Sequence, residues 1–243
     1  KILGSTLKKI AIEKSGAMIK KQQICFSTEQ KKSVKKILID KAKKLKLKIH
    51  FFEKNIKTKN TIIPKFLLGE HQIKNAQFIY QITHFLHKNK IIYLNFSKTQ
   101  KAIEQTKWPG RFQIIKTHPT IIYDVAHNKE SLSGVAKTIM KYKKEYENKI
   151  LICGFENNKK IKQPISNLSK QFNKIICTET QIRKSMPAQK ILKKSNKIET
   201  IINTQKAIQH AISISSNKDL IVILGSHFFA PTIKKMFKNC FAK

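Results

Sequence analysis

Residues 120–128 read Thr-Ile-Ile-Tyr-Asp-Val-Ala-His-Asn, and this stretch decides how the second half of the chain is interpreted. The apolar run 120–123 predicts a buried strand, and a helix is expected to begin near Glu130, after His127 and Asn128. In this arrangement a ligand can meet both the carboxyl end of a strand and the amino end of a helix. Asp124 and Asn128 could equally cap the helix, because short polar side chains are favoured there.

The rest of the second half predicts a mostly parallel sheet with helices on both faces. Apolar runs recur at 120–123, 150–153, 174–177, 199–202 and 220–224, and amphipathic segments of helix length separate them. One such segment has apolar side chains at helical spacing, which predicts a single buried helix face. These side chains are Leu132, Val135, Ala136, Ile139 and Met140.

The first half of the chain predicts another alternating α/β unit. Helices are expected at 5–15, 30–45, 72–87 and 97–106, and strands at 23–27, 48–52 and 61–66. The run Trp108-Pro109-Gly110 then interrupts the pattern, since proline disfavours helix at the preceding residue and glycine permits an irregular turn. We therefore predict one domain over residues 1–106 and a second over residues 107–243.

The chain is strongly basic, with a formal net charge of +36 at pH 7. Such a charge is typical of nucleic-acid binders. However, only Arg111 and Arg183 are arginines, the side chain that favours base and phosphate recognition. Lysine is spread along the whole chain, and abundant Lys, Ile and Asn with scarce Gly and Arg indicates an AT-rich coding sequence. We predict no nucleic-acid partner.

A basic nucleic-acid-binding module remains an alternative. In that case the aromatic side chains of Phe51, Phe52, Phe228 and Phe229 would be the stacking surfaces. Their position in or beside apolar runs favours a place in the core instead.

No membrane or disulfide framework is expected. No apolar run approaches the roughly 20 residues that cross a bilayer. The four cysteines, Cys25, Cys153, Cys177 and Cys240, are widely spaced and form no Cys-x-x-Cys pair, which is typical of reduced thiols in a cytoplasmic protein.

Several motifs together resemble a known family. Residues 108–113, Trp-Pro-Gly-Arg-Phe-Gln, followed by a strand and Asp-Val-Ala-His-Asn, resemble the start of the C-terminal domain of folylpolyglutamate and dihydrofolate synthases, in the Mur ligase superfamily. Residues 3–16 (Leu-Gly-x-Thr, then Ile-Ala-x-Glu-Lys-x-Gly), 69–76 (Gly-x-His-Gln-x-x-Asn-Ala) and 224–226 (Leu-Gly-Ser) resemble other segments of the same family, in the expected order. The resemblance covers essentially the whole chain. It implies the C-terminal part of a Mur-ligase-like ATP-binding domain, followed by a Rossmann-like, mostly parallel α/β domain that binds glutamate.

The resemblance also implies a reaction. ATP and Mg²⁺ would serve to phosphorylate a folate or dihydropteroate carboxylate, and the amine of L-glutamate would attack the acyl phosphate to give an amide. Whether the first glutamate is added, the polyglutamate tail is extended, or both, stays open. A monomer is expected. A peptidoglycan Mur ligase, which shares the fold and the ATP chemistry, is the nearest alternative enzyme.

Site residues follow from the resemblance, position by position. Lys14 would be an N-carboxylysine with a catalytic role, while Asn75, Arg111 and Asp124 would bind ATP. For Lys14 the alternative is an ordinary surface lysine, and for Arg111 a surface ion pair.

Two further residues, His127 and Ser226, would lie near the incoming glutamate, and His127 would also be catalytic. For both, the alternative is a turn-stabilising hydrogen bond. His71 is expected to be structural.

The chain also departs from the family pattern. It contains no Gly-x-x-x-x-Gly-Lys-Ser/Thr phosphate loop, and the metal-binding glutamate and histidine are missing, so no complete metal site is expected. Asn158-Lys159-Lys160 stands where relatives have Asp-Lys-Asp, and Lys129 replaces a proline. We expect a fragment of an active enzyme, inactive by itself; a decaying gene is the alternative.

Overall fold

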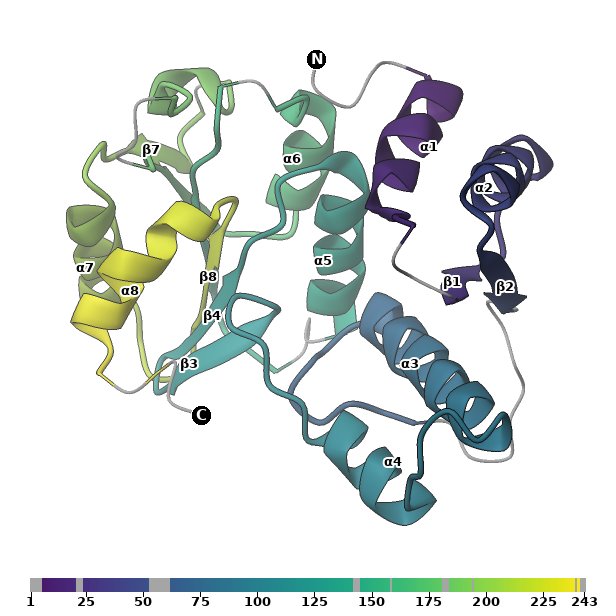
Figure 1. Cartoon of the computed structure of the whole chain (residues 1–243). Helices are drawn as coiled ribbons and strands as arrows, with labels where there is room; N and C mark the ends of the chain where they lie inside the picture. Colours follow the sequence, from purple (N-terminus) through teal and green to yellow (C-terminus); the bar gives the residue numbers. More distant parts are fainter. Residues whose placement is uncertain are drawn as a thin grey trace. The chain divides into compact units, whose positions relative to one another are not determined.

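The computed structural model describes residues 6–20, 24–52, 62–141, 145–157, 159–180, 184–193, 195–238 and 240. The chain divides into two compact units (Figure 1). Unit 1 comprises residues 1–63 and 74–104, and unit 2 comprises residues 64–73 and 105–243. The domain division at residues 106 and 107 stays a prediction. Within the described residues, no helix is both long and apolar enough to cross a membrane.

Unit 1 is an α/β unit built on two parallel strands. Its elements are α1 (Leu7–Lys14), η1 (Ser15–Ala17), β1 (Ile24–Thr28), α2 (Lys32–Leu45), β2 (Lys48–Phe52), α3 (Glu70–Lys88, of which residues 74–88 belong to this unit) and α4 (Phe96–Glu104). The predicted helices and the first two strands are confirmed to within about two residues. The predicted strand 61–66 is wrong: residues 62–66 are irregular, and Thr61 lies outside the described residues.

The two strands of unit 1 present different chemistry on their two faces, because side chains alternate along a strand. Cys25 and Ile49, which are register partners, pack against the cluster that includes Ala42 of α2. Phe26 on the opposite face stacks on Phe52 and meets the edge of Phe85 on α3, with ring centroids 5.8 and 5.4 Å apart. Helices therefore cover both faces of this small sheet.

Unit 2 contains a six-stranded sheet in the order β3-β4-β8-β5-β6-β7. Its elements are β3 (Gln113–Thr117), β4 (Thr120–Asp124), α5 (Lys129–Lys141), β5 (Lys149–Cys153), α6 (Lys162–Ser169), β6 (Lys174–Cys177), η2 (Ala188–Lys190), β7 (Ile198–Thr200), α7 (Thr204–Ser213), β8 (Leu220–Leu224), η3 (His227–Phe229) and α8 (Ala230–Met236). Only β3 runs antiparallel to its neighbour. The predicted mostly parallel sheet is confirmed.

Helices cover both faces of this sheet, as predicted. Figure 1 shows α5 and α6 on one side and α7 and α8 on the other. One cluster of buried side chains joins α5 and α6 to alternate strand residues such as Leu151 and Val222. A second joins α7 and α8 to the residues between them, such as Ile152 and Ile221. Each strand of the sheet centre is therefore apolar on both faces, which explains its continuous apolar sequence.

Three details of unit 2 differ from the sequence prediction. The edge strand β3 was not expected, because its side chains are half-buried or exposed and form no continuous apolar run. The predicted strand 199–202 is observed at Ile198–Thr200. Met140 was predicted on the buried face of α5 but is 62% exposed, whereas Thr138 is buried instead. The buried face of α5 thus ends at Ile139.

All four cysteines are free thiols. Cys153 and Cys177 are buried register partners at the ends of β5 and β6. The aromatic residues considered as stacking surfaces behave differently from one another. Phe229 is completely buried, whereas Phe228 is 47% exposed, so only the former is confirmed as core.

Candidate functional site

The candidate site lies where β4 and β8 end, next to each other in the sheet of unit 2. Asp124 is the last residue of β4, and its register partner is Leu224 at the end of β8. The N–H of Gly225 donates to the carbonyl oxygen of Asp124 at 3.2 Å, which joins the two loops that follow. In parallel sheets, ligands bind at this carboxyl edge.

The carboxylate of Asp124 holds two backbone segments together. Oδ2 accepts a hydrogen bond from the N–H of Phe112 and Oδ1 accepts one from the N–H of Ala126, both at 2.7 Å. The side chain is only 4% exposed. Burial raises the pKa of Asp124 to about 6, against the two backbone hydrogen bonds and the positive charges of Arg111 and His127, which lower it. Asp124 therefore does not cap the following helix.

Asn128 does cap that helix, which confirms for this residue the alternative prediction of a helix cap. Its side-chain Oδ1 accepts from the N–H of Ser131 at 2.9 Å, at the start of α5. The two polar ends of the motif thus have separate structural tasks.

The turn before β3 has an unusual backbone that places Arg111. Gly110 and Phe112 both have positive φ angles, 71° and 47°. The carbonyl oxygen of Gly110 accepts from the N–H of Val125 at 3.0 Å, and a Cβ at Gly110 would come within 2.7 Å of the Val125 side chain. Glycine is needed here for both the close approach and the conformation. Arg111 is therefore held beside the end of β4.

Arg111 lies near enough to two imidazoles to affect their pKa values. Burial lowers the pKa of His71, and the positive charge of Arg111 lowers it further. Burial also lowers the pKa of His227, again with contributions from Arg111 and His127. Arg111 forms no salt bridge with any described residue. One permanent cation therefore lies near the imidazoles of His71 and His227, a combination suited to an anionic ligand.

His127 has a defined tautomer. Its Nδ1 lies 2.8 Å from the carbonyl oxygen of Val125. A carbonyl oxygen can only accept, so Nδ1 carries the proton and Nε2 is the nitrogen available to a ligand. The backbone N–H of His127 donates to Ser131 Oγ at 3.2 Å, which fixes the residue further.

Ser226 and His227 complete the second loop. Ser226 is 3% exposed; its Oγ accepts from the N–H of Phe228 at 3.2 Å, and its carbonyl oxygen accepts from the Tyr123 hydroxyl at 2.9 Å. His227 is exposed, and its ring centroid lies 6.4 Å from that of His127. The sequence interpretation missed His227. Its place directly after the Gly-Ser turn, in a chain with eight histidines, was the signal that could have found it.

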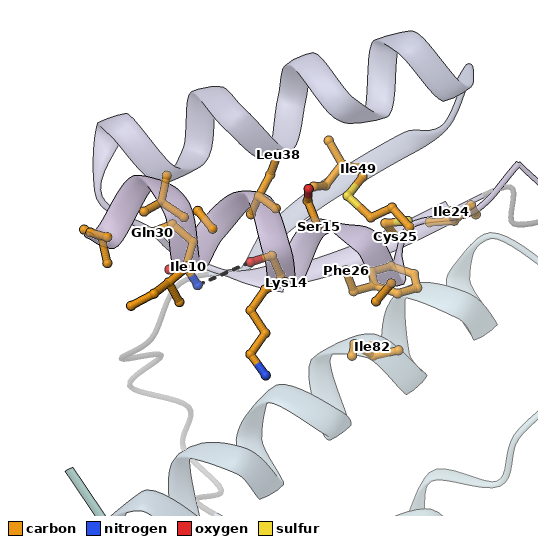
Figure 2. Close-up of a pocket in the computed structure, with 16 residues that line it drawn as sticks. Ile10, Lys14, Ser15, Ile24, Cys25, Phe26, Gln30, Leu38, Ile49 and Ile82 are labelled. Carbon is orange, nitrogen blue, oxygen red and sulfur yellow. Dashed lines mark hydrogen bonds between the residues drawn. The ribbon is translucent and has the colours of Figure 1, made fainter. Parts of the chain in front are cut away.

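The structure brings four of the predicted site residues together in unit 2, and two lie in unit 1. The four are Arg111, Asp124, His127 and Ser226. Lys14 is exposed at the last position of α1 and lines a largely apolar cavity of about 660 Å³. Figure 2 shows its side chain directed away from that of Ser15. Asn75 is exposed on α3.

The described residues contain no group of three His, Cys, Asp or Glu side chains that could hold a metal ion. In the loop after β5, Lys159 forms an ion pair with Glu156 at 3.7 Å. Asn158 and residues 3–5 of the predicted motifs lie outside the described residues.

Comparison with known proteins assigns a family to most of unit 2. The model of the family "Mur ligase, glutamate ligase domain" matches residues 110–227. Residues 110–227 resemble a Mur ligase glutamate ligase domain. The match begins at the Gly110 turn and ends at His227, so it contains both loops of the candidate site. The predicted resemblance to the superfamily is confirmed.

Curated relatives come from two branches of this superfamily. The chain is 24% identical over 178 residues to the dihydrofolate synthase/folylpolyglutamate synthase of Bacillus subtilis, which covers 71% of this chain and 40% of the relative. It is 26% identical over 214 residues to the UDP-N-acetylmuramoyl-L-alanyl-D-glutamate--2,6-diaminopimelate ligase of Wigglesworthia glossinidia brevipalpis, covering 79% of this chain and 42% of the relative. The chain therefore spans less than half the length of these two relatives.

Solved structures match the fold over nearly the whole chain. The folylpolyglutamate synthase of Mycobacterium tuberculosis, complexed with ADP, superimposes with a TM-score of 0.78 at 18% identity, covering 98% of this chain and 60% of that one. Escherichia coli FolC in complex with DHPP and ADP gives a TM-score of 0.74 at 16% identity, with 96% and 57% coverage. The α/β fold class predicted for the chain is confirmed.

Proposed function

We propose that the chain is part of an ATP-dependent ligase that joins L-glutamate to a folate-type carboxylate, dihydropteroate or folyl(poly)glutamate, with release of ADP and phosphate. The observation that carries the proposal is the position of Arg111, His127 and Ser226 on adjoining loops of a Mur ligase glutamate ligase domain. Two solved structures of similar fold, titled as folylpolyglutamate synthase complexed with ADP and as folylpolyglutamate synthase/dihydrofolate synthase with Mn, AMPPNP and L-glutamate bound, support the choice of ligands.

Arg111 is the residue suited to a nucleotide phosphate. A guanidinium pairs with phosphate oxygens through two parallel hydrogen bonds. It would neutralise charge as the phosphoryl group is transferred to the substrate carboxylate. Asp124 is buried and has both oxygens engaged, so its part is to position the turn that carries Arg111. A direct ATP contact by Asp124, like that of Asn75, stays a prediction.

His127 is suited to the second half of the reaction. The amine of glutamate must lose a proton to form the amide, and an unprotonated Nε2 of His127 can accept it. The hydrogen bond from Nδ1 to Val125 holds the ring in the tautomer that leaves Nε2 free. Ser226 is buried, and its hydrogen bonds with Tyr123 and Phe228 shape the neighbouring loop. A contact of Ser226 with glutamate stays a prediction.

The described residues do not by themselves fit a magnesium site, because no three acidic, histidine or cysteine side chains converge. No step is therefore derived through the metal. The N-carboxylysine at Lys14, the monomeric state, the absence of a nucleic-acid partner and the cytoplasmic location stay predictions. Two relatives are named as UDP-N-acetylmuramoyl-L-alanyl-D-glutamate--2,6-diaminopimelate ligases. The alternative function is therefore that of a diaminopimelate ligase.

Titration of the ¹⁵N-labelled chain with L-glutamate, followed by NMR, tests the proposal. We expect shifts at the amides of His127, Ser226 and His227, and loss of these shifts in His127→Ala. Amide shifts with meso-diaminopimelate but none with L-glutamate would instead support the function of a peptidoglycan Mur ligase. Steeply salt-dependent binding of duplex DNA, with no response to L-glutamate or ADP, would overturn the ligase proposal.

A further inference from the structure

A cavity in unit 2, of about 680 Å³, lies between α5 and α6. This volume is within the range of ligand pockets, roughly 300–1,000 Å³. Its floor is apolar: Leu132 and Leu168 are completely buried, and Ala136 and Pro164 are half-buried beside them. We call it the α5–α6 groove. It is not part of the two site loops described above.

Lysines form the rim of the α5–α6 groove. Lys129, Lys159, Lys160 and Lys162 all line it, and no acidic side chain does. Only Lys159 has an ion-pair partner, Glu156, among the described residues. Three ammonium groups over an apolar floor therefore lack a counter-charge, and a ligand with several negative charges would supply it.

One amide acceptor in the groove also lacks a partner. Oε1 of Gln171 is buried and accepts no hydrogen bond, and Gln171 lines the groove. An unsatisfied buried acceptor destabilises the fold, and a ligand N–H can remove that cost. The occupant should therefore offer an N–H group in addition to its charges.

The groove begins at the candidate site. Lys129 directly follows Asn128 and is the first residue of α5, so one end of the rim adjoins the loop that carries His127. A ligand in the groove would therefore reach the reacting centre proposed above without crossing the rest of the domain.

We propose that the α5–α6 groove binds the γ-linked oligoglutamate tail of the folate-type substrate. Each γ-glutamyl unit offers one carboxylate for the lysine rim, one amide N–H for an acceptor such as Gln171, and two methylene groups for the floor at Leu132 and Leu168. The proposal rests on the proposed function for the identity of the tail. It adds a tail-binding site to the chain, on the helices of the glutamate ligase domain.

Isothermal titration of the 243-residue chain with tetra-γ-L-glutamate, without nucleotide or other substrate, tests this site. We expect the double variant Lys160→Gln/Lys162→Gln to weaken binding about tenfold, since two charge contacts at exposed sites are lost. Lys137→Gln is the matched control: Lys137 is exposed on α5 but does not line the groove, so affinity should stay unchanged. Gln171→Leu, which removes the acceptor and no charge, should weaken binding independently of salt.

Several results would overturn the tail site. These are no binding of tetra-γ-L-glutamate, equal weakening by Lys137→Gln and the double variant, or monomeric L-glutamate bound in the groove as tightly as the tetramer. Tighter binding of an eight-nucleotide single-stranded DNA through the same lysines would assign the groove to nucleic acid instead. The proposed ligase function is separable, because Arg111→Lys and His127→Ala should leave tail binding intact. Suppose that the chain binds tetra-γ-L-glutamate but the amide of His127 shows no shift with L-glutamate. This result would contradict the proposed ligase function, while the groove would still be a binding site for an acidic chain.

Discussion

The backbone N–H of Phe112 donates a 2.7 Å hydrogen bond to Oδ2 of Asp124, twelve residues later in the chain. Through this bond a buried carboxylate fixes the turn that carries Arg111, while its other oxygen fixes the loop that leads to His127. One side chain thus sets the relative position of the two groups to which we assign the chemistry.

Asp124→Asn should destabilise unit 2. Asparagine can accept from one N–H but presents its own NH₂ to the other, which leaves a buried donor unpaired at a cost of roughly 1–3 kcal/mol. Urea unfolding of the variant measures this loss. Asp40→Asn on the exposed side of α2 is the control and should change stability by less than about 0.5 kcal/mol. A loss no larger than the control's would contradict the role of Asp124.

The unfolding free energies of the wild type and of Asp124→Asn should depend differently on pH. Burial raises the pKa of folded Asp124 from 3.8 to about 6, so the folded state holds the proton more tightly than the unfolded state. The resulting stability is present at about pH 4 and is lost as the pH rises through 6. Relative to Asp124→Asn, the wild-type unfolding free energy should therefore fall between about pH 4 and pH 7. A difference that is constant over this range would refute the raised pKa.

Gly225 and Gly134 should respond oppositely to replacement by alanine. Gly225 has a φ of 123°, and a Cβ there would collide with the carbonyl oxygen of Gly154. Gly225→Ala should cost more than about 2 kcal/mol of unfolding free energy. Gly134 lies inside α5, where the nearest atom to an added Cβ is 3.5 Å away, so Gly134→Ala should stabilise by about 0.5–1 kcal/mol. Thermal unfolding followed by circular dichroism compares the two.

Removing the charge of Arg111 should raise the pKa of two histidines. Its guanidinium lowers the pKa of both His71 and His227, so Arg111→Gln should shift both titrations toward higher pH. NMR titration of the imidazole signals detects this shift. Lys170→Gln, an exposed site at the end of α6, should leave both histidines unchanged. An unchanged His227 titration in Arg111→Gln would show that the two side chains do not sense each other.

Glu199 links two strands to α7 and should make a small, pH-dependent contribution to the free energy of unfolding. Its oxygens contact Lys174 Nζ at 2.7 Å and His210 Nε2 at 2.8 Å. The hydrogen bond from Lys174 lowers the pKa of Glu199 despite partial burial, so the stabilisation is present above the unfolded pKa and is lost as the pH falls through the folded one. Glu199→Gln should cost less than about 1 kcal/mol near pH 7, because the group is 38% exposed and solvent screens it. The difference from wild type should vanish in acid unfolding experiments.

Much of the fold could be predicted from the sequence because the central strands are buried on both faces. The apolar runs that became β4, β5, β6 and β8 were each located to within one residue. β3 was not predicted because it is an edge strand whose side chains, such as Ile114 at 50% exposed, form no continuous apolar run. Helix periodicity found α5 but extended its buried face to Met140, which tertiary packing leaves in solvent.

The site was predicted only in part. The motif pointed to the loop at Asp124, but not to its hydrogen bond with Phe112, because that contact depends on the antiparallel return of β3. His227 was missed for a related reason: it comes near His127 only because β4 and β8, about 100 residues apart, are neighbours in the sheet. Contacts that depend on strand order cannot be predicted from local spacing.

The central position of β8 has a consequence for biosynthesis. Of the six strands in this sheet β8 comes last in the sequence, yet it lies between β4 and β5. Until residues 220–224 leave the ribosome, the pair β3-β4 and the block β5-β6-β7 have no strand between them and expose apolar faces. The sheet of unit 2 must therefore complete its folding after residues 220–224 have been made, and a chaperone that shields apolar strands would act in that interval.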